Sequence, residues 1–237
     1  MCDCVMFGLK TGVSRGFSMK QFVSRISTAR LLLVSIIFTL AVTLLRLIGE
    51  LRGWPSPWFD KTSGIVGITW VLPPAFGFCF AWKLWHDGQR IARVDRAFLL
   101  GVLGFASNQL VEATVFQFVG ISIYSMLLIL WAVAIVSAYL QYLAWPALWK
   151  ILIAYELGAR MPVVIIMFFA LRGHWGTHYD RPSGPFRWSF WPTFLWLGFF
   201  EELIYWVSFT VTFGSLAGSL AAAFAKRGMR ARESTAR

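Results

Sequence analysis

The sequence of 237 residues contains few charged side chains. Asp, Glu, Lys and Arg together make up 14% of it, whereas a soluble domain has about 25%. Hydrophobic residues reach 58%, against about 45–50% in a soluble domain. A water-soluble fold of this size cannot cover so much apolar surface with so few charges. The composition therefore excludes a soluble enzyme and a disordered chain.

Cysteine is also scarce, and three common functional motifs are missing. The cysteines are Cys2, Cys4 and Cys79, which excludes a disulfide scaffold. The Walker A motif G-x-x-x-x-G-K-S/T, the dinucleotide motif G-x-G-x-x-G and the zinc-protease motif H-E-x-x-H do not occur. The sequence thus gives no sign of the nucleotide-binding or zinc-protease classes that these motifs define.

Long apolar blocks fill most of the chain, and such blocks are typical of membrane spans. They predict an all-α polytopic membrane protein, with a bundle of six transmembrane helices in one domain over residues 30–225. Adjacent Pro73 and Pro74 fall near the middle of the second span and predict a kink or a break there. The expected spans are 31–48, 65–85, 98–119, 121–145, 147–171 and 203–222.

Two tails flank this domain. Residues 1–29 are expected to form a cytoplasmic tail, in which Met19, Phe22 and Ile26 share one helical face. This spacing predicts a short interfacial helix that lies on the lipid surface. Residues 226–237 form a basic tail, also expected in the cytoplasm.

The basic residues outnumber the acidic ones, 22 to 11, so the formal net charge is +11. They cluster at the ends of the apolar blocks, where they meet anionic lipid head groups. The sequence has no separate surface of basic and aromatic residues, so nucleic-acid binding is not expected. With the N-terminus inside, the tails and inner loops hold 15 of the 22 basic residues and the outer segments hold six. This bias predicts a multi-pass protein of a bacterial-type cytoplasmic (inner) membrane with both termini in the cytoplasm.

Glu156 and Arg160 lie four residues apart in the fifth span, in the order that favours an ion pair on one helix. An intramembrane charge is costly unless it is paired, and it marks a functional site by default. Two interpretations stay open. The pair either pins helices together, or it forms a gate or binding site for a charged substrate beside Pro162, which would loosen the helix.

Glu112 is a second intramembrane charge, with Asn108 one helical turn away on the same face. Gly101 and Gly104 share that face and would let a helix or a ligand approach closely. Either Glu112 has no partner and carries a proton, or it pairs with Arg160 across the bundle. In the second case two carboxylates face one guanidinium, and the remaining negative charge needs a proton or a cation.

Glu201 and Glu202 lie near the start of the last span. They belong to the bilayer if that helix begins at Phe194, and to its outer edge if it begins at Leu203. Neighbours on a helix point about 100° apart. At most one of the two carboxylates is therefore expected to face the core.

An outer loop contains His174, His178 and Asp180. Imidazoles four residues apart on a helix can share a zinc ion, with a carboxylate as third ligand. Gly173 and Gly176 argue against a regular helix. The loop is therefore either a zinc site or an interfacial loop rich in Trp, Tyr and His. No other cofactor is predicted.

The last span carries a stripe of small residues, Gly214, Gly218 and Ala222. Such a stripe indicates close helix packing, and it predicts a homo-oligomer if the partner helix belongs to a second copy.

Three functions are compatible with these residues. The favoured hypothesis is a non-enzymatic membrane protein that binds or translocates a small solute, ion or lipid through a site of Asn108, Glu112, Glu156 and Arg160. The first alternative is a metal-dependent membrane enzyme that uses the outer loop. The second is a scaffold subunit whose charges only specify helix packing.

Overall fold

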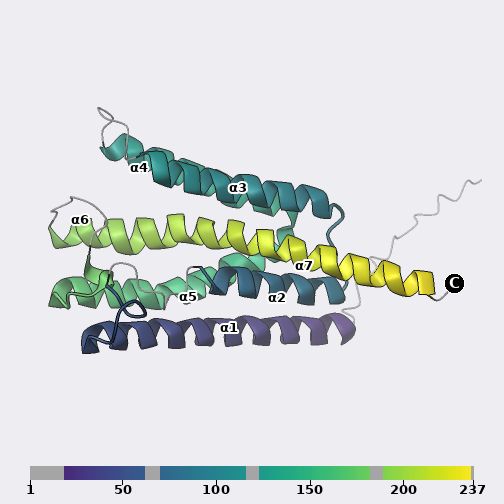
Figure 1. Ribbon diagram of the computed structural model, residues 1–237, viewed down its shortest axis with the longest axis horizontal. Helices are drawn as coiled ribbons and strands as arrows, with labels where there is room; N and C mark the ends of the chain where they lie inside the picture. The colour runs from purple at the N-terminus through teal and green to yellow at the C-terminus, as the bar shows by residue number, and fades with distance from the viewer. Residues whose placement is uncertain (1–18, 62–69, 116–122, 182–188, 236–237) are drawn as a thin grey trace, which may run out of the picture.

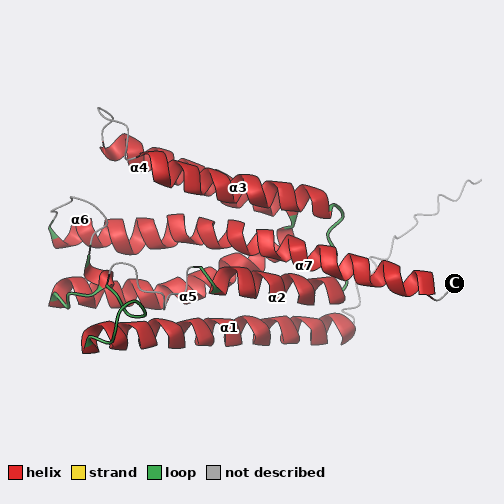
Figure 2. Cartoon of the chain, viewed as in Figure 1, coloured by secondary structure: helices red, strands yellow, loops and turns green. Residues whose placement is uncertain are grey.

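The computed structural model describes residues 19–61, 70–115, 123–181 and 189–235, and every regular element in these ranges is a helix (Figures 1 and 2). The last three elements follow one another without a break and make one continuous helix, whose middle part has π-helical hydrogen bonding. The elements are α1 (Met19–Arg52), α2 (Leu72–His86), α3 (Val94–Val115), α4 (Ile123–Ala144), α5 (Pro146–Gly173), the 3-10 turn η1 (His178–Asp180), α6 (Phe190–Phe194), the π-helix η2 (Leu195–Trp206) and α7 (Val207–Thr235).

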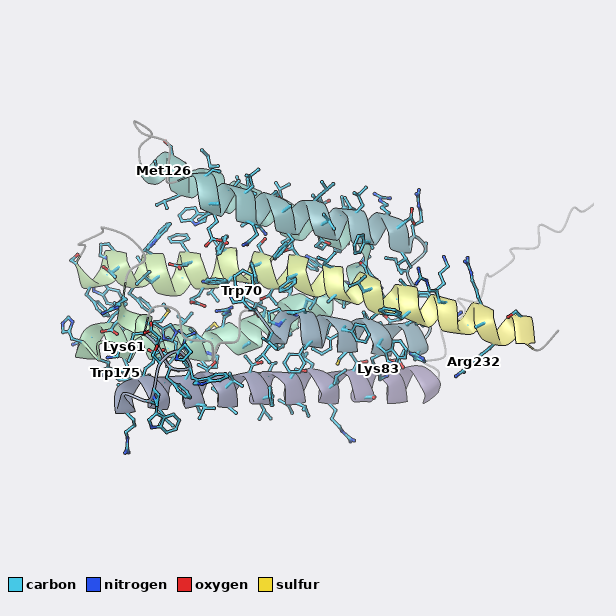
Figure 3. The ribbon with its side chains drawn as sticks, viewed as in Figure 1. Lys61, Trp70, Lys83, Met126, Trp175 and Arg232 are labelled. Carbon is cyan, nitrogen blue, oxygen red and sulfur yellow. The ribbon has the colours of Figure 1, made fainter. Side chains whose placement is uncertain are left out.

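The helices run along one axis, so the bundle has two ends (Figure 1). One end carries Lys61 and Trp175 and the other carries Lys83 and Arg232 (Figure 3). We call them the Trp175 end and the Lys83 end. The first residues of α1 and the last residues of α7 both lie at the Lys83 end. The central helix is α7, which contacts the α3–α4 pair on one side and α2 and α5 on the other.

Apolar side chains cover the outside of the bundle, and many polar side chains lie inside it. On α1, Leu33 and Ile37 are exposed while Ser35, Thr39 and Thr43 are buried. A soluble bundle has the opposite arrangement, because its polar face meets water. Exposed apolar surface on this scale marks a contact with lipid or with another protein.

Among the described residues, five helices are long and apolar enough to cross a membrane, which indicates a membrane-embedded protein. The second expected span, 65–85, is the one without a counterpart among these five, and it falls partly on residues 62–69, outside the described ranges. Its described part is α2, which has 15 residues. The candidate spans are Ser27–Arg52, Val94–Thr114, Ser125–Ala144, Pro146–Gly173 and Phe190–Arg232.

Two local predictions can be compared with these helices. Pro73 and Pro74 lie at a helix start and not in the middle of a helix, because α2 begins at Leu72 and the prolines occupy its first turn, which fits a break and not a kink. That turn tolerates proline, since its backbone N–H groups have no partner within the helix. The helix expected near the N-terminus is not separate from the first span, because α1 runs without interruption from Met19 to Arg52; its place on the lipid surface stays a prediction.

The small residues of the last helix pack against other helices of the same chain. A Cβ atom on Gly77 of α2 would lie 2.3 Å from the carbonyl oxygen of Gly214, and one on Gly218 would lie 2.6 Å from the Leu148 side chain. The close packing predicted for this face is therefore found within the chain. The homo-oligomer stays a prediction.

Candidate functional site

The buried face of α5 carries two charged side chains at the middle of the helix. Its buried residues recur every three or four positions, the spacing of one helical face. Glu156 and Arg160 fall on that face and are 2% and 4% exposed. Arg160 lies at the midpoint of α5, at the greatest distance from both ends of the helix.

Arg160 contacts two carboxylates from two different helices. Its Nε atom donates a hydrogen bond to Glu156 Oε1 at 2.5 Å, and an Nη atom donates to Glu202 Oε2 at 2.7 Å. Glu202 is 7% exposed. The guanidinium carbon also lies 5.4 Å from the centre of the Trp206 ring, within the range of a cation–π interaction. We call Glu156, Arg160 and Glu202 the Arg160 cluster.

The cluster contains two carboxylates and one guanidinium. With all three groups ionised, it carries one surplus negative charge in the interior of the bundle. A buried unpaired charge is costly in free energy, so it is neutralised by a proton or by a second cation. The arrangement is thus suited to holding a small positive species.

The π-helix η2 positions the second carboxylate. In a π-helix each N–H bonds to the carbonyl five residues earlier, and such segments occur frequently at functional sites. From η2, Glu202 reaches Arg160 on α5 while the Tyr205 hydroxyl donates a hydrogen bond to Glu112 on α3. Glu201 is only partly buried. One of the two adjacent carboxylates therefore faces the core, as predicted.

The structure joins only some of the predicted site residues. The expected contact between Glu156 and Arg160 is confirmed. The expected pairing of Glu112 with Arg160 is wrong, because Glu202 takes that place and the Glu112 side chain is exposed. Asn108 belongs neither to the Arg160 cluster nor to the contact between Glu112 and Tyr205. Its Nδ2 donates a hydrogen bond to Ser208 Oγ at 3.1 Å and links α3 to the last helix.

The glycines beside Asn108 have the packing role that the sequence predicts. A Cβ atom on Gly101 would lie 3.2 Å from the Leu216 Cα, and one on Gly104 would lie 2.8 Å from the Gln141 amide nitrogen. The face of α3 that carries them packs against α4 and α7. It is therefore a contact between helices.

The Arg160 cluster lies between two apolar clusters. Towards the Lys83 end, the buried side chains of α5 include Leu152, Tyr155 and Ala159, which pack with α2 and α7. Towards the Trp175 end, α5 contributes Val163 and Met167 to a second cluster. The remaining members of this second cluster are Leu47, Leu127, Ala170, Tyr179, Trp196 and Leu197. The charged groups are thus enclosed along the axis of the bundle.

The three residues predicted to bind zinc have separate roles in the structure. His174 ends α5 in the left-handed conformation, with φ of 50°. The carboxylate of Asp180 accepts hydrogen bonds from the N–H groups of Gly176 and Thr177, at 2.8 and 2.7 Å. In the described part of the chain, no three His, Cys, Asp or Glu side chains are grouped to hold a metal ion. Zinc binding stays a prediction.

His178 contacts Glu50, a buried carboxylate near the end of α1 that sequence reasoning missed. Glu50 accepts hydrogen bonds from Arg46 Nε and from the His178 backbone N–H, both at 2.9 Å. The His178 Nδ1 atom lies 2.6 Å from the same carboxylate. Burial lowers the pKa of the His178 imidazole, although Glu50 opposes the shift. The signal in the sequence was the spacing of Arg46 and Glu50, four residues apart on one helix.

One further sequence pattern lies near the N-terminus. The segment from Gly12 to Gly16 has the spacing G-x-S-x-G with Ser14 at its centre, as in the nucleophile elbow of hydrolases. This segment lies outside the described residues.

No protein-family model, curated protein or solved structure matches the chain. Function is therefore inferred from the geometry of the Arg160 cluster and from the distribution of charge and apolar surface.

Proposed function

We propose that this protein is a multi-pass protein of a bacterial-type cytoplasmic membrane, and that it binds or translocates a small cation, a proton included, at the Arg160 cluster. The observation that carries the proposal is the contact of one buried arginine with two carboxylates from two helices. Its surplus negative charge selects the sign of the ligand, because a second positive charge neutralises the cluster and an anion does not.

The distribution of basic residues supports the sidedness of this proposal. Lys83, Arg93 and Arg96 lie at the end of the bundle where both described chain ends lie. Positively charged loops face the cytoplasm in membrane proteins and attract anionic lipid head groups. The Lys83 end is thus the cytoplasmic end, and the Trp175 end faces the outside.

The placement of the cluster supports binding within the membrane. Arg160 lies at the midpoint of a helix of 28 residues, which is about 42 Å long at 1.5 Å per residue. This length exceeds the hydrocarbon core of about 30 Å, so the midpoint lies deep in that core. A cation that reaches it from either side crosses about half of the bilayer.

Cation-dependent stability tests the proposal. The purified full-length chain is unfolded by heat in sodium, potassium, lithium and choline chloride at equal ionic strength, and across pH 5 to 8. We expect one cation, or protons, to raise the melting temperature, since a ligand that binds only the folded state stabilises it by mass action. Glu202→Gln removes the surplus charge and should abolish the response.

Glu201→Gln is the matched control. It removes a carboxylate at the adjacent position that is only partly buried and makes no ion pair with Arg160 among the described contacts. It should keep the response of the parent. A parent insensitive to every cation and to pH, or a Glu202→Gln variant that responds like the parent, would contradict the proposal.

A scaffold subunit is the second candidate function. The specific observation in its favour is that Arg160 of α5 reaches η2 through its ion pair with Glu202, which is what a structural link between helices requires. The same measurement separates the two functions, because a scaffold has no reason to respond to one particular cation.

A further inference from the structure

The turn of residues 177–180 folds back into the Trp175 end of the bundle. Thr177 and Tyr179 are buried, although Trp175 and Gly176 just before them are exposed. Tyr179 is 3% exposed and belongs to the same apolar cluster as Leu47 of α1. A surface loop does not ordinarily bury an aromatic ring among transmembrane helices. This turn therefore fills a space inside the bundle.

Contacts to α1 hold the turn in place. The buried Glu50 carboxylate accepts the His178 backbone N–H and lies 2.6 Å from His178 Nδ1. The Tyr179 hydroxyl donates a hydrogen bond to the Thr43 carbonyl oxygen at 3.3 Å. Asp180 accepts hydrogen bonds within the turn and fixes its shape. The turn is thus a preformed unit attached to α1 through Glu50 and Thr43.

Tyr179 packs in the apolar cluster that lies between the Trp175 end and the Arg160 cluster. Its apolar cluster includes Val163 and Met167 of α5. Val163 comes three residues after Arg160 on the same buried face of α5, so it is the next buried position towards the Trp175 end. The ring of Tyr179 therefore belongs to the layer that separates the charged groups from the Trp175 end.

We propose that residues 177–180 form a plug that closes the Arg160 cluster from the Trp175 end, and that release of His178 from Glu50 opens it. As the regulation of a binding site, the inference rests on the proposed function. Tyr179 supplies the bulk of the plug. Glu50 is its latch, because one carboxylate holds both the backbone and the side chain of His178.

The attachment of the plug is suited to opening. The side chain of His178 is 27% exposed while the Glu50 carboxylate is fully buried, so the outer part of the imidazole meets solvent. When the turn leaves, its own N–H groups and the Tyr179 hydroxyl bond to water, which offsets part of the loss of their present hydrogen bonds. Segments that move in binding are drawn from the parts of a fold with low local stability.

Cysteine accessibility tests the plug directly. Val163→Cys is introduced into a full-length chain whose native cysteines are replaced by serine, and a membrane-impermeant thiol reagent is added to the Trp175 side of oriented vesicles. We expect little labelling while Tyr179 is present. Tyr179→Ala should raise the labelling rate at least tenfold, and Glu50→Ala, which removes the acceptor of the His178 N–H, should raise it by releasing His178. Tyr179→Phe keeps the ring and should stay close to the parent.

Tyr139→Ala is the matched control, because it removes a large aromatic side chain from the exposed surface of α4. Its labelling rate should equal that of the parent. Rapid labelling with Tyr179 in place would overturn the proposal. So would a folded, monodisperse Tyr179→Ala variant whose Val163→Cys stays unlabelled. Should Tyr179→Ala fail to fold, the rate for Glu50→Ala decides in the same way.

The labelling result does not depend on the identity of the ligand. A plug that opens in a protein with no cation response would refute the proposed function and leave the plug standing. A cation response combined with equal labelling rates in the parent and in Tyr179→Ala would refute the plug and leave the proposed function standing.

Discussion

Single residues decide the chemistry of this protein, and Arg160 is the most important of them. An arginine at the middle of an apolar helix is stable only with partners, because a charge in the bilayer interior is costly. Here it has one partner on its own helix and one on η2. The second partner converts a neutral pair into a cluster with a surplus negative charge, and that surplus is the basis of the proposed cation site.

Removal of Arg160 should strand both carboxylates. Breaking a buried ion pair typically costs about 3–5 kcal/mol, so Arg160→Met should lower the melting temperature of the purified protein sharply. The triple variant Arg160→Met, Glu156→Gln, Glu202→Gln should recover much of the loss, since no charge is left unpaired. Arg93→Met is the control, because its pair with Asp95 is exposed on both sides and such pairs contribute about 0–1 kcal/mol. An Arg160→Met variant as stable as the parent would show that Arg160 is not buried.

At the scale of elements, the continuous last helix organises the bundle. Its π-helical segment supplies Glu202 and Tyr205, and α7 packs against α2 where two glycines meet. Those glycines allow backbones to approach closely, which is how helices associate in an apolar environment without help from the hydrophobic effect.

Substitution of Gly77 should therefore separate α2 from α7. The Cβ of Gly77→Ala would lie 2.3 Å from the carbonyl oxygen of Gly214, and backbone cannot move aside as a side chain can. We expect a clear fall in the melting temperature. Gly228→Ala on α7 meets nothing within 4 Å and should be neutral or stabilising by up to about 1 kcal/mol, since alanine favours helix. Equal melting temperatures for the two variants would contradict the packing described here.

The comparison of elements also shows what the sequence can predict. Helical periodicity was sufficient to place Glu156 and Arg160 on one buried face and to join them. It was not sufficient to choose between Glu112 and Glu202 as the second partner, because that choice depends on a π-helical segment and on contacts between distant helices. The prolines of α2 were misplaced for a related reason. An apolar block shows where a span can lie, but not where its helix begins.

At the scale of the whole molecule, the inverted polarity of the bundle indicates a membrane environment. Apolar side chains face outward and buried polar side chains link the helices, which is an arrangement that lipid permits and water does not. Whether α2 belongs to a sixth span depends on how α2 and residues 62–69 are placed in the bundle, and sequence periodicity cannot predict that placement. The positions of the basic residues at the Lys83 end do not depend on the number of spans.

Topology can be measured at both ends of the bundle. Reporter fusions at Trp85 and Arg227 should read as cytoplasmic, and fusions at Trp58 and Tyr179 should read as external, because basic segments stay in the cytoplasm. Trp85 lies near the end of α2 and Arg227 near the end of α7, both towards the Lys83 end. An external C-terminus would contradict an even number of spans with both termini inside.

The most direct test of a cation site at the Arg160 cluster is the movement of charge when the site fills. Reconstituted protein on a supported membrane is exposed to a jump in cation concentration or pH, and the transient current is recorded. A cation that enters the middle of the bilayer displaces charge even without net transport. We predict a transient current in the parent and in Glu201→Gln, and none in Glu202→Gln. A parent that gives no current with any cation or pH jump, or a Glu202→Gln variant with an undiminished current, would contradict the proposed site.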